Sequence, residues 1–227
     1  MKAWGKISCK QFYSSGSASE AITPVVGSLL MQLILIVLAG AISGIIFNSV
    51  GEDANSQTPM ARITVESCKG GLYGVGPTTK RVTLEENKIV LMHEGGDALP
   101  LSTTSIKISG YGNSYQGDVG NGGTRVEGDT EVFYENLSPE KKNNTYVSRN
   151  SATLEDGFWT IGEKLILCGQ DSSKYVNSSV KVSVDGDSNT SDNYGFKADS
   201  EILLRIIDSK SRNILVEKRI IVQHAGK

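Results

Sequence analysis

The chain has 227 residues, a formal net charge of −2 and 25 glycines. Nucleic-acid binding requires a basic face, so this mildly acidic composition argues against a nucleic-acid partner. Glycine together with abundant serine, asparagine, aspartate and threonine favours a β domain with many turns.

Residues 1–21 are polar and basic, with Lys2, Lys6 and Lys10 against Glu20. We interpret them as a leader peptide that is cleaved, and they are left out of the fold. Positive charge before an apolar helix predicts that the N-terminus lies in the cytoplasm and the rest of the chain outside the cell.

Residues 22–47 contain no Asp, Glu, Lys, Arg or His. A bilayer core about 30 Å thick is spanned by about 20 apolar residues in a helix, so this stretch is long enough to be a transmembrane helix. It is apolar all round rather than on one face, so a single soluble core would not bury it. The sequence therefore predicts a hydrophobic helix over residues 22–48, placed in lipid or against other helices like itself.

Two features of this helix predict contacts with other helices. Gly40 and Gly44 lie four positions apart, which lets two helix backbones approach closely. Gln32 is the only large polar side chain in the stretch. Because an unpaired amide in hydrocarbon costs several kcal/mol, we expect Gln32 to face a neighbouring helix.

The junction over residues 20–27, EAITPVVG, followed by a long apolar helix, resembles the N-terminal signature of archaeal type IV pilins. The resemblance implies that a membrane-embedded prepilin peptidase cuts between Ala21 and Ile22, on the cytoplasmic side. Glu20 stands where many relatives carry Lys or Arg, and Val26 stands where bacterial relatives carry Glu. The segment HEGGD over residues 93–97 resembles a recurrent element of the β-sandwich body of the same family.

This resemblance also implies a function. The chain would be a major or minor structural subunit of a surface filament that mediates adhesion or cell–cell contact. Its partners would be copies of itself, other pilins, the prepilin peptidase, and the membrane before assembly. No cofactor and no enzymatic activity are expected.

Other interpretations of the same segments stay open. The apolar stretch could be a secretory signal cut after Ala41, or an uncleaved anchor of an extracytoplasmic binding domain, for example one for carbohydrate. Aromatic side chains could stack on sugars, and the candidates are Trp159, Tyr111, Tyr115, Tyr134, Tyr146, Tyr175 and Tyr194. A third alternative is an archaellum subunit.

After a polar hinge at residues 49–59, the apolar residues alternate with period two, which indicates strands. Short strands with long turns predict an all-β antiparallel sandwich over residues 60–227. Gly95 and Gly96 permit a positive φ at a tight turn. Residues 110–152 and 169–199 are interpreted as polar excursions. The predicted strands cover residues 63–67, 81–84, 88–93, 106–108, 131–134, 165–168, 201–207 and 214–222, with hairpins joining the second to the third and the last two.

Few residues of the body suggest chemistry. His93 adjoins the two glycines, and we expect it to have a structural role. Cys68 and Cys168 would form either a disulfide or two buried free thiols. Asp185, Asp187 and Asn189 begin like a calcium loop, but the glycine and the glutamate that such a loop needs are absent, so a solvated loop is preferred.

Four Asn-x-Ser/Thr sequences, all in the polar excursions, are candidate glycosylation sites. They begin at Asn136, Asn143, Asn177 and Asn189.

Overall fold

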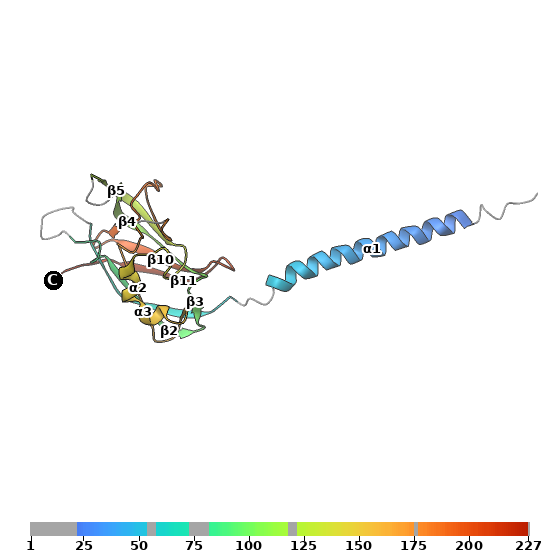
Figure 1. Ribbon diagram of the computed structural model, residues 1–227, viewed down its shortest axis with the longest axis horizontal. Coiled ribbons are helices and arrows are strands. Elements are labelled where there is room, and N and C mark those ends of the chain that lie inside the picture. Colours follow the sequence, from blue (N-terminus) through green and yellow to red (C-terminus); the bar gives the residue numbers. More distant parts are fainter. Residues whose placement is uncertain (1–21, 54–57, 73–81, 118–121, 175–176, 227) are drawn as a thin grey trace, which may run out of the picture. The chain divides into compact units, whose positions relative to one another are not determined.

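The computed structural model describes residues 22–53, 58–72, 82–117, 122–174 and 177–226 (Figure 1). The chain divides into two compact units, Met1–Ser56 and Gln57–Lys227. The first unit contains helix α1 (Ile22–Asp53), and the second contains the strands that the structure describes. The predicted leader and Ala21 lie outside the described residues.

Helix α1 begins at Ile22 and continues past the predicted end at residue 48 to Asp53. The hinge predicted at residues 49–59 is therefore helical in its first part. The structure describes the side chains of residues 26–41 within α1, and all of them are exposed. Within the described residues, no helix has the combination of length and hydropathy that crossing a bilayer requires.

The second unit consists mainly of two antiparallel sheets and an additional two-stranded sheet. The smaller main sheet has the order β12 (Gln223–His224), β1 (Ala61–Gly70), β2 (Lys88–Gly96), β7 (Lys164–Cys168). The larger has the order β11 (Asn213–Ile221), β10 (Glu201–Asp208), β4 (Thr104–Gln116), β5 (Thr124–Tyr134), β8 (Val180–Val184), and β9 (Gly195–Phe196) pairs with β4. Strands β3 (Leu99–Pro100) and β6 (Phe158–Trp159) form the additional sheet. The short parallel pairing of β1 with β12 is the exception to the antiparallel pattern among the described pairs.

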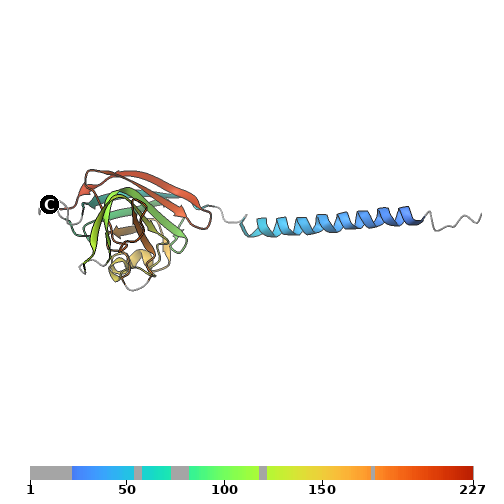
Figure 2. The same ribbon diagram turned by 90° about the horizontal axis from the view of Figure 1, so that it is seen from above.

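One hydrophobic core lies between the two main sheets, because each strand turns alternate residues inward. Strand β2 buries Ile89 and Leu91, and β10 buries Ile202, Leu204 and Ile206 in the same core. The strands β10 and β11, drawn in red, run along one side of this unit, and the yellow helices lie on the other (Figure 2). The β-rich body predicted from the sequence is confirmed, and its architecture is consistent with a sandwich.

The excursion predicted at residues 110–152 is largely regular structure. Strands β4 and β5 form one long hairpin whose register runs from Ile106 opposite Tyr134 to Gln116 opposite Thr124. The buried positions of β5 include Gly128 and Thr130. Neither is a large apolar residue, so the sequence shows no apolar alternation here. Two short helices follow, α2 (Asn144–Arg149) and α3 (Ser151–Leu154). The second excursion likewise contains β8 and β9.

The first hairpin was predicted wrongly in one strand. Residues 88–93 are strand β2 as expected, but in the described part of the preceding segment Val82 makes an isolated bridge and residues 84–86 form a turn. Glu86 closes that turn by donating its backbone N–H to the Thr83 carbonyl at 3.1 Å. The terminal hairpin is confirmed, with Ile202 opposite Ile220.

The turn after β2 requires a glycine at one position. Gly96 has a φ of 97°, as predicted for one of the two glycines. A Cβ atom at Gly96 would lie 2.0 Å from the Met60 carbonyl oxygen, whereas a Cβ atom at Gly95 would meet nothing within 4 Å. The close approach of Met60 to this turn therefore depends on Gly96 and not on Gly95.

Candidate functional site

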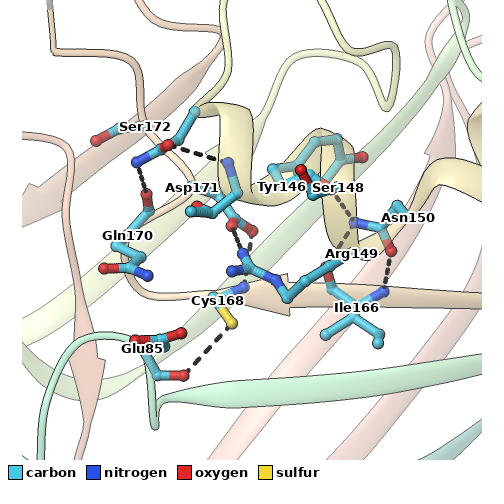
Figure 3. Close-up of polar contacts among 12 residues, drawn as sticks. Glu85, Tyr146, Ser148, Arg149, Asn150, Ile166, Cys168, Gln170, Asp171 and Ser172 are labelled. Carbon is cyan, nitrogen blue, oxygen red and sulfur yellow. Dashed lines mark hydrogen bonds and ion pairs between the residues drawn. The ribbon is translucent and has the colours of Figure 1, made fainter.

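A buried polar cluster of the body surrounds Asp171, in the turn after β7 (Figure 3). Its carboxylate has no exposed surface. Oδ2 accepts hydrogen bonds from the Tyr134 hydroxyl at 2.9 Å and the Cys168 backbone N–H at 2.7 Å, and Oδ1 accepts one from Arg149. The Tyr134 hydroxyl also shares a hydrogen bond with the Tyr194 hydroxyl at 2.9 Å. This cluster connects β5, α2 and the turn after β7.

Burial is the main cause of the pKa shifts in this cluster. It raises the pKa of Asp171 from 3.8 to about 6, against the opposing effects of the Cys168 N–H and the positive charge of Arg149. The pKa of Tyr134 and of Tyr194 lies well above the usual value, mainly through burial and then through the charge of Asp171. At neutral pH the cluster therefore contains an ionised carboxylate, a guanidinium and two neutral phenols.

Asn150 attaches the two short helices to the smaller sheet. Its side-chain amide donates to the carbonyls of Tyr146 at 3.0 Å and Ile166 at 2.9 Å, and its Oδ1 accepts from the Ile166 N–H at 2.7 Å (Figure 3). The side chain is almost fully buried, so all these bonds are protected from water. Asn150 and Asp171 together hold α2 and α3 against β7.

Sequence reasoning did not identify the Asp171 cluster. Asp171, Arg149 and Asn150 all lie in segments that the composition assigns to polar excursions, where such residues are common. Partners 22 residues apart, as Arg149 and Asp171 are, produce no local pattern. The partial signal was the presence of Tyr134 and Cys168 at the ends of predicted strands.

The two cysteines of the body are free and buried in the structure. Cys68 lies on β1 opposite Ile89, and Cys168 lies on β7 opposite Lys88, so strand β2 runs between them. Burial raises the pKa of each thiol to about 12. Both are therefore neutral thiols near pH 7 and poor nucleophiles.

The segment that resembled a calcium loop forms a tight turn between Val184 and Asp187. These two residues exchange backbone hydrogen bonds at 3.0 and 2.9 Å, and the central residues Asp185 and Gly186 both have positive φ, as in a type I′ turn. The Asp185 carboxylate accepts from the Asp129 N–H, and Asp187 accepts from Gln116 and from the Asn189 N–H. Among the described residues, no group of three acidic, His or Cys side chains is arranged to hold a metal.

The four glycosylation candidates differ in environment. Asn177 and Asn189 are exposed. Asn143 is half-buried, caps α2 by accepting from the Thr145 N–H at 3.1 Å, and donates its Nδ2 to the Gln170 carbonyl at 3.1 Å. Asn136 is half-buried, and its Oδ1 accepts from Lys142 and from the Ser138 N–H, both at 3.2 Å.

The side chain of His93 is buried and packed against other residues. The ring has no exposed surface, stacks edge-to-face on Trp159 at 5.8 Å between centroids, and places Nε2 3.0 Å from the Asp97 carbonyl. Trp159 donates its indole N–H to the Glu163 carbonyl at 3.1 Å. The pair anchors the turn after β2 to the turn after β6.

The aromatic residues considered for sugar stacking are mostly unavailable to a ligand. Tyr175 lies outside the described residues, Tyr111 is exposed and Tyr115 is half-buried. The remaining four are core side chains, namely Trp159, Tyr134, Tyr146 and Tyr194.

The helix residues proposed for packing are only partly described. Gln32 and Gly40 are exposed, and nothing lies within 4 Å of a Cβ atom built on Gly40. The surroundings of Gly44 and Ile22 lie outside the described side chains. Gly40 therefore has room for a close neighbour from outside this part of the chain.

No protein-family model matches the chain, and no curated protein matches it either.

Proposed function

We propose that this chain is a structural subunit of an archaeal type IV pilus-like surface filament that mediates adhesion or cell–cell contact. The observation that carries the proposal is the exposed apolar surface of α1. The nine large apolar side chains between Leu29 and Leu38 are each 52–72% exposed. Covering one such side chain is worth about 1.5–3 kcal/mol, so this surface strongly favours association with lipid or with other helices.

The proposed mechanism begins in the membrane. The leader and the apolar helix hold the chain in the bilayer with its N-terminus in the cytoplasm, and the prepilin peptidase cuts between Ala21 and Ile22. The helix then leaves the lipid and packs among copies of itself and other pilins. Because one apolar environment replaces another, this transfer costs little hydrophobic free energy and gains helix–helix packing.

A repeated asymmetric contact between subunits gives an open helical filament rather than a closed ring. The β-rich body has its own core, including Leu91, Ile108 and Leu204, so it needs no contribution from α1 to bury its apolar residues. In this proposal the body stays folded before, during and after assembly. The protein acts as an extracellular building unit on the cell surface and uses no cofactor.

The test is mass spectrometry of the N-terminus of the protein in sheared surface filaments. A start at Ile22, in a fraction enriched in filaments, is the expected result. A start at Ile42 would mean ordinary secretion with most of the helix removed, and an intact Met1 that stays with the membrane would mean a plain anchor. Either of these two outcomes would overturn the proposal.

A further inference from the structure

Lys142 is a lysine whose side chain is almost completely enclosed by the body. It is 6% exposed. Its Nζ atom donates to the Ser138 carbonyl at 2.7 Å, to Ser179 Oγ at 2.9 Å and to Asn136 Oδ1 at 3.2 Å. It also lies 5.3 Å from the centroid of the Tyr146 ring.

This amine has an unusual electrostatic environment for a buried lysine. Among the described residues, no carboxylate forms an ion pair with Lys142, although the charges of Asp171, Glu135 and Glu140 act on it from further away. Burial therefore dominates and lowers the pKa of Lys142 to about 8. Close to neutral pH the amine can therefore lose one proton. The neutral amine keeps two N–H groups, for the Ser138 carbonyl and Ser179 Oγ, and its electron pair is then free to face Asn136, so it is a potential nucleophile.

The side chain beside this amine is an electrophile held in a fixed position. With Lys142 neutral, the Oδ1 atom of Asn136 accepts a hydrogen bond from the Ser138 N–H at 3.2 Å and lies 3.2 Å from Lys142 Nζ. The Ser138 N–H polarises this carbonyl and stabilises negative charge that develops on Oδ1 during the attack.

The backbone around both groups is fixed by β8 and the residue before it. The backbone carbonyl of Ser179 accepts a hydrogen bond from the Glu135 N–H at 2.9 Å, and the Ser179 N–H donates to the Lys141 carbonyl at 3.0 Å. The Ser179 hydroxyl donates to the Glu140 carbonyl at 3.0 Å. Lys142 also makes an isolated bridge with Ser172. The amine and the amide are therefore held together by the fold, which converts their encounter into an intramolecular one.

We propose that Lys142 and Asn136 join in an intramolecular isopeptide bond. The electron pair of neutral Lys142 Nζ attacks Asn136 Cγ, an Nζ–Cγ bond forms, and the Cγ–Nδ2 bond breaks. A proton leaves Nζ and ends on the departing nitrogen, so one ammonia molecule is released. The reaction is an exchange of one amide for another and needs no oxidant, metal or other reactant.

The bond would change two properties of this region. It converts a buried amine that can carry a charge into a neutral amide, which removes the cost of burying that charge. It also consumes the Nδ2 atom of Asn136, the atom to which a glycan would be attached. Cross-linking and glycosylation of Asn136 are therefore mutually exclusive. This inference does not depend on filament assembly.

The test is mass spectrometry of the full chain under denaturing conditions. The expected intact mass is lower than the sequence mass by one ammonia molecule, after allowance for N-terminal processing. Trypsin is expected to release a branched peptide in which residues 126–141 are joined to residues 142–149. Two results would overturn the proposal. One is an intact mass without the loss of ammonia, together with ordinary tryptic peptides that end at Lys142. The other is a glycan on Asn136.

Three variants make the assignment specific. Lys142→Arg keeps the charge but cannot form the bond, so the loss of ammonia is expected to disappear. Lys141→Arg changes the exposed neighbouring lysine and is expected to keep the loss. Asn136→Asp is expected to lose water in place of ammonia.

Persistence of the ammonia loss in Lys142→Arg would assign it to another site and overturn the proposal. Should Lys142→Arg fail to fold, the branched peptide of the unaltered chain decides by its presence or absence.

Discussion

Arg149 on α2 donates its guanidinium N–H to the carboxylate of Asp171, in the turn after β7. The carboxylate is fully buried, and the Arg149 side chain is 17% exposed. This contact carries the only positive charge that forms an ion pair with Asp171 among the described residues. It therefore connects the stability of the β7 turn to the position of the short helices.

Replacing Arg149 with Met is expected to lower the free energy of unfolding by about 3 kcal/mol at pH 8, because it leaves an ionised buried carboxylate without its countercharge. The loss should shrink toward pH 4, where Asp171 can take up a proton. Urea unfolding of the full chain in detergent measures both values. The matched control is Arg62→Met, which removes the exposed pair with Glu94 and should cost less than about 1 kcal/mol. Equal losses in the two variants would contradict a special role for Arg149.

Stability should depend on pH through Asp171. Its folded pKa, about 6, lies above the ordinary value of 3.8, so the folded chain holds this proton more tightly than the unfolded chain does. The resulting stabilisation is fully present below about pH 4 and is lost as the pH rises through about 6. The loss should amount to about 3 kcal/mol in the unaltered chain. Asp171→Asn lacks this titration, so parallel stability curves for the two proteins between pH 4 and 6 would show that the prediction is wrong.

Gly96→Ala should destabilise the body strongly. A positive φ costs a residue with a side chain about 1–2 kcal/mol, and the new Cβ atom would also overlap the Met60 carbonyl oxygen. The expected loss is more than about 2 kcal/mol in urea unfolding. Gly95→Ala, one residue earlier, has open space around its Cβ position and should cost less than about 1 kcal/mol. If Gly95→Ala lowered the free energy of unfolding more than Gly96→Ala does, the conclusion that the turn depends on Gly96 would be wrong.

Gln32→Leu should weaken the proposed filament. The side chain of Gln32 is exposed in the isolated chain, so its amide is available to a neighbouring helix. The temperature at which sheared filaments dissociate is expected to fall. Met31→Leu exchanges one exposed apolar side chain for another and should leave that temperature unchanged. An unchanged temperature in both variants would mean that Gln32 makes no contact between subunits.

Glycan occupancy should follow exposure. If the chain is glycosylated, Asn177 and Asn189 are expected to carry the glycans, because both are exposed. Asn143 should be unmodified, since its Nδ2 is hydrogen-bonded to the Gln170 carbonyl and its Oδ1 caps α2. Glycopeptide mass spectrometry measures each site, and a glycan on Asn143 with none on Asn177 or Asn189 would contradict this ranking.

The sequence by itself determined the features that depend on local patterns. The alternation of apolar residues predicted β2, β7 and the hairpin of β10 with β11, because a strand must turn every second side chain toward the core. The adjacent glycines predicted the positive φ found at Gly96. The helix start at Ile22 also agrees with the uncharged stretch.

Only the tertiary structure decided the features that depend on partners distant in sequence. The hairpin of β4 with β5 buries Thr130, Asn113 and Ser114, so its buried positions look polar when they are read along the chain. Asp171 becomes a buried carboxylate, and Lys142 a buried amine next to Asn136, through loops and short helices that no periodicity predicts. The energy of these contacts comes from burial and hydrogen bonding, which exist only once the sheets have formed.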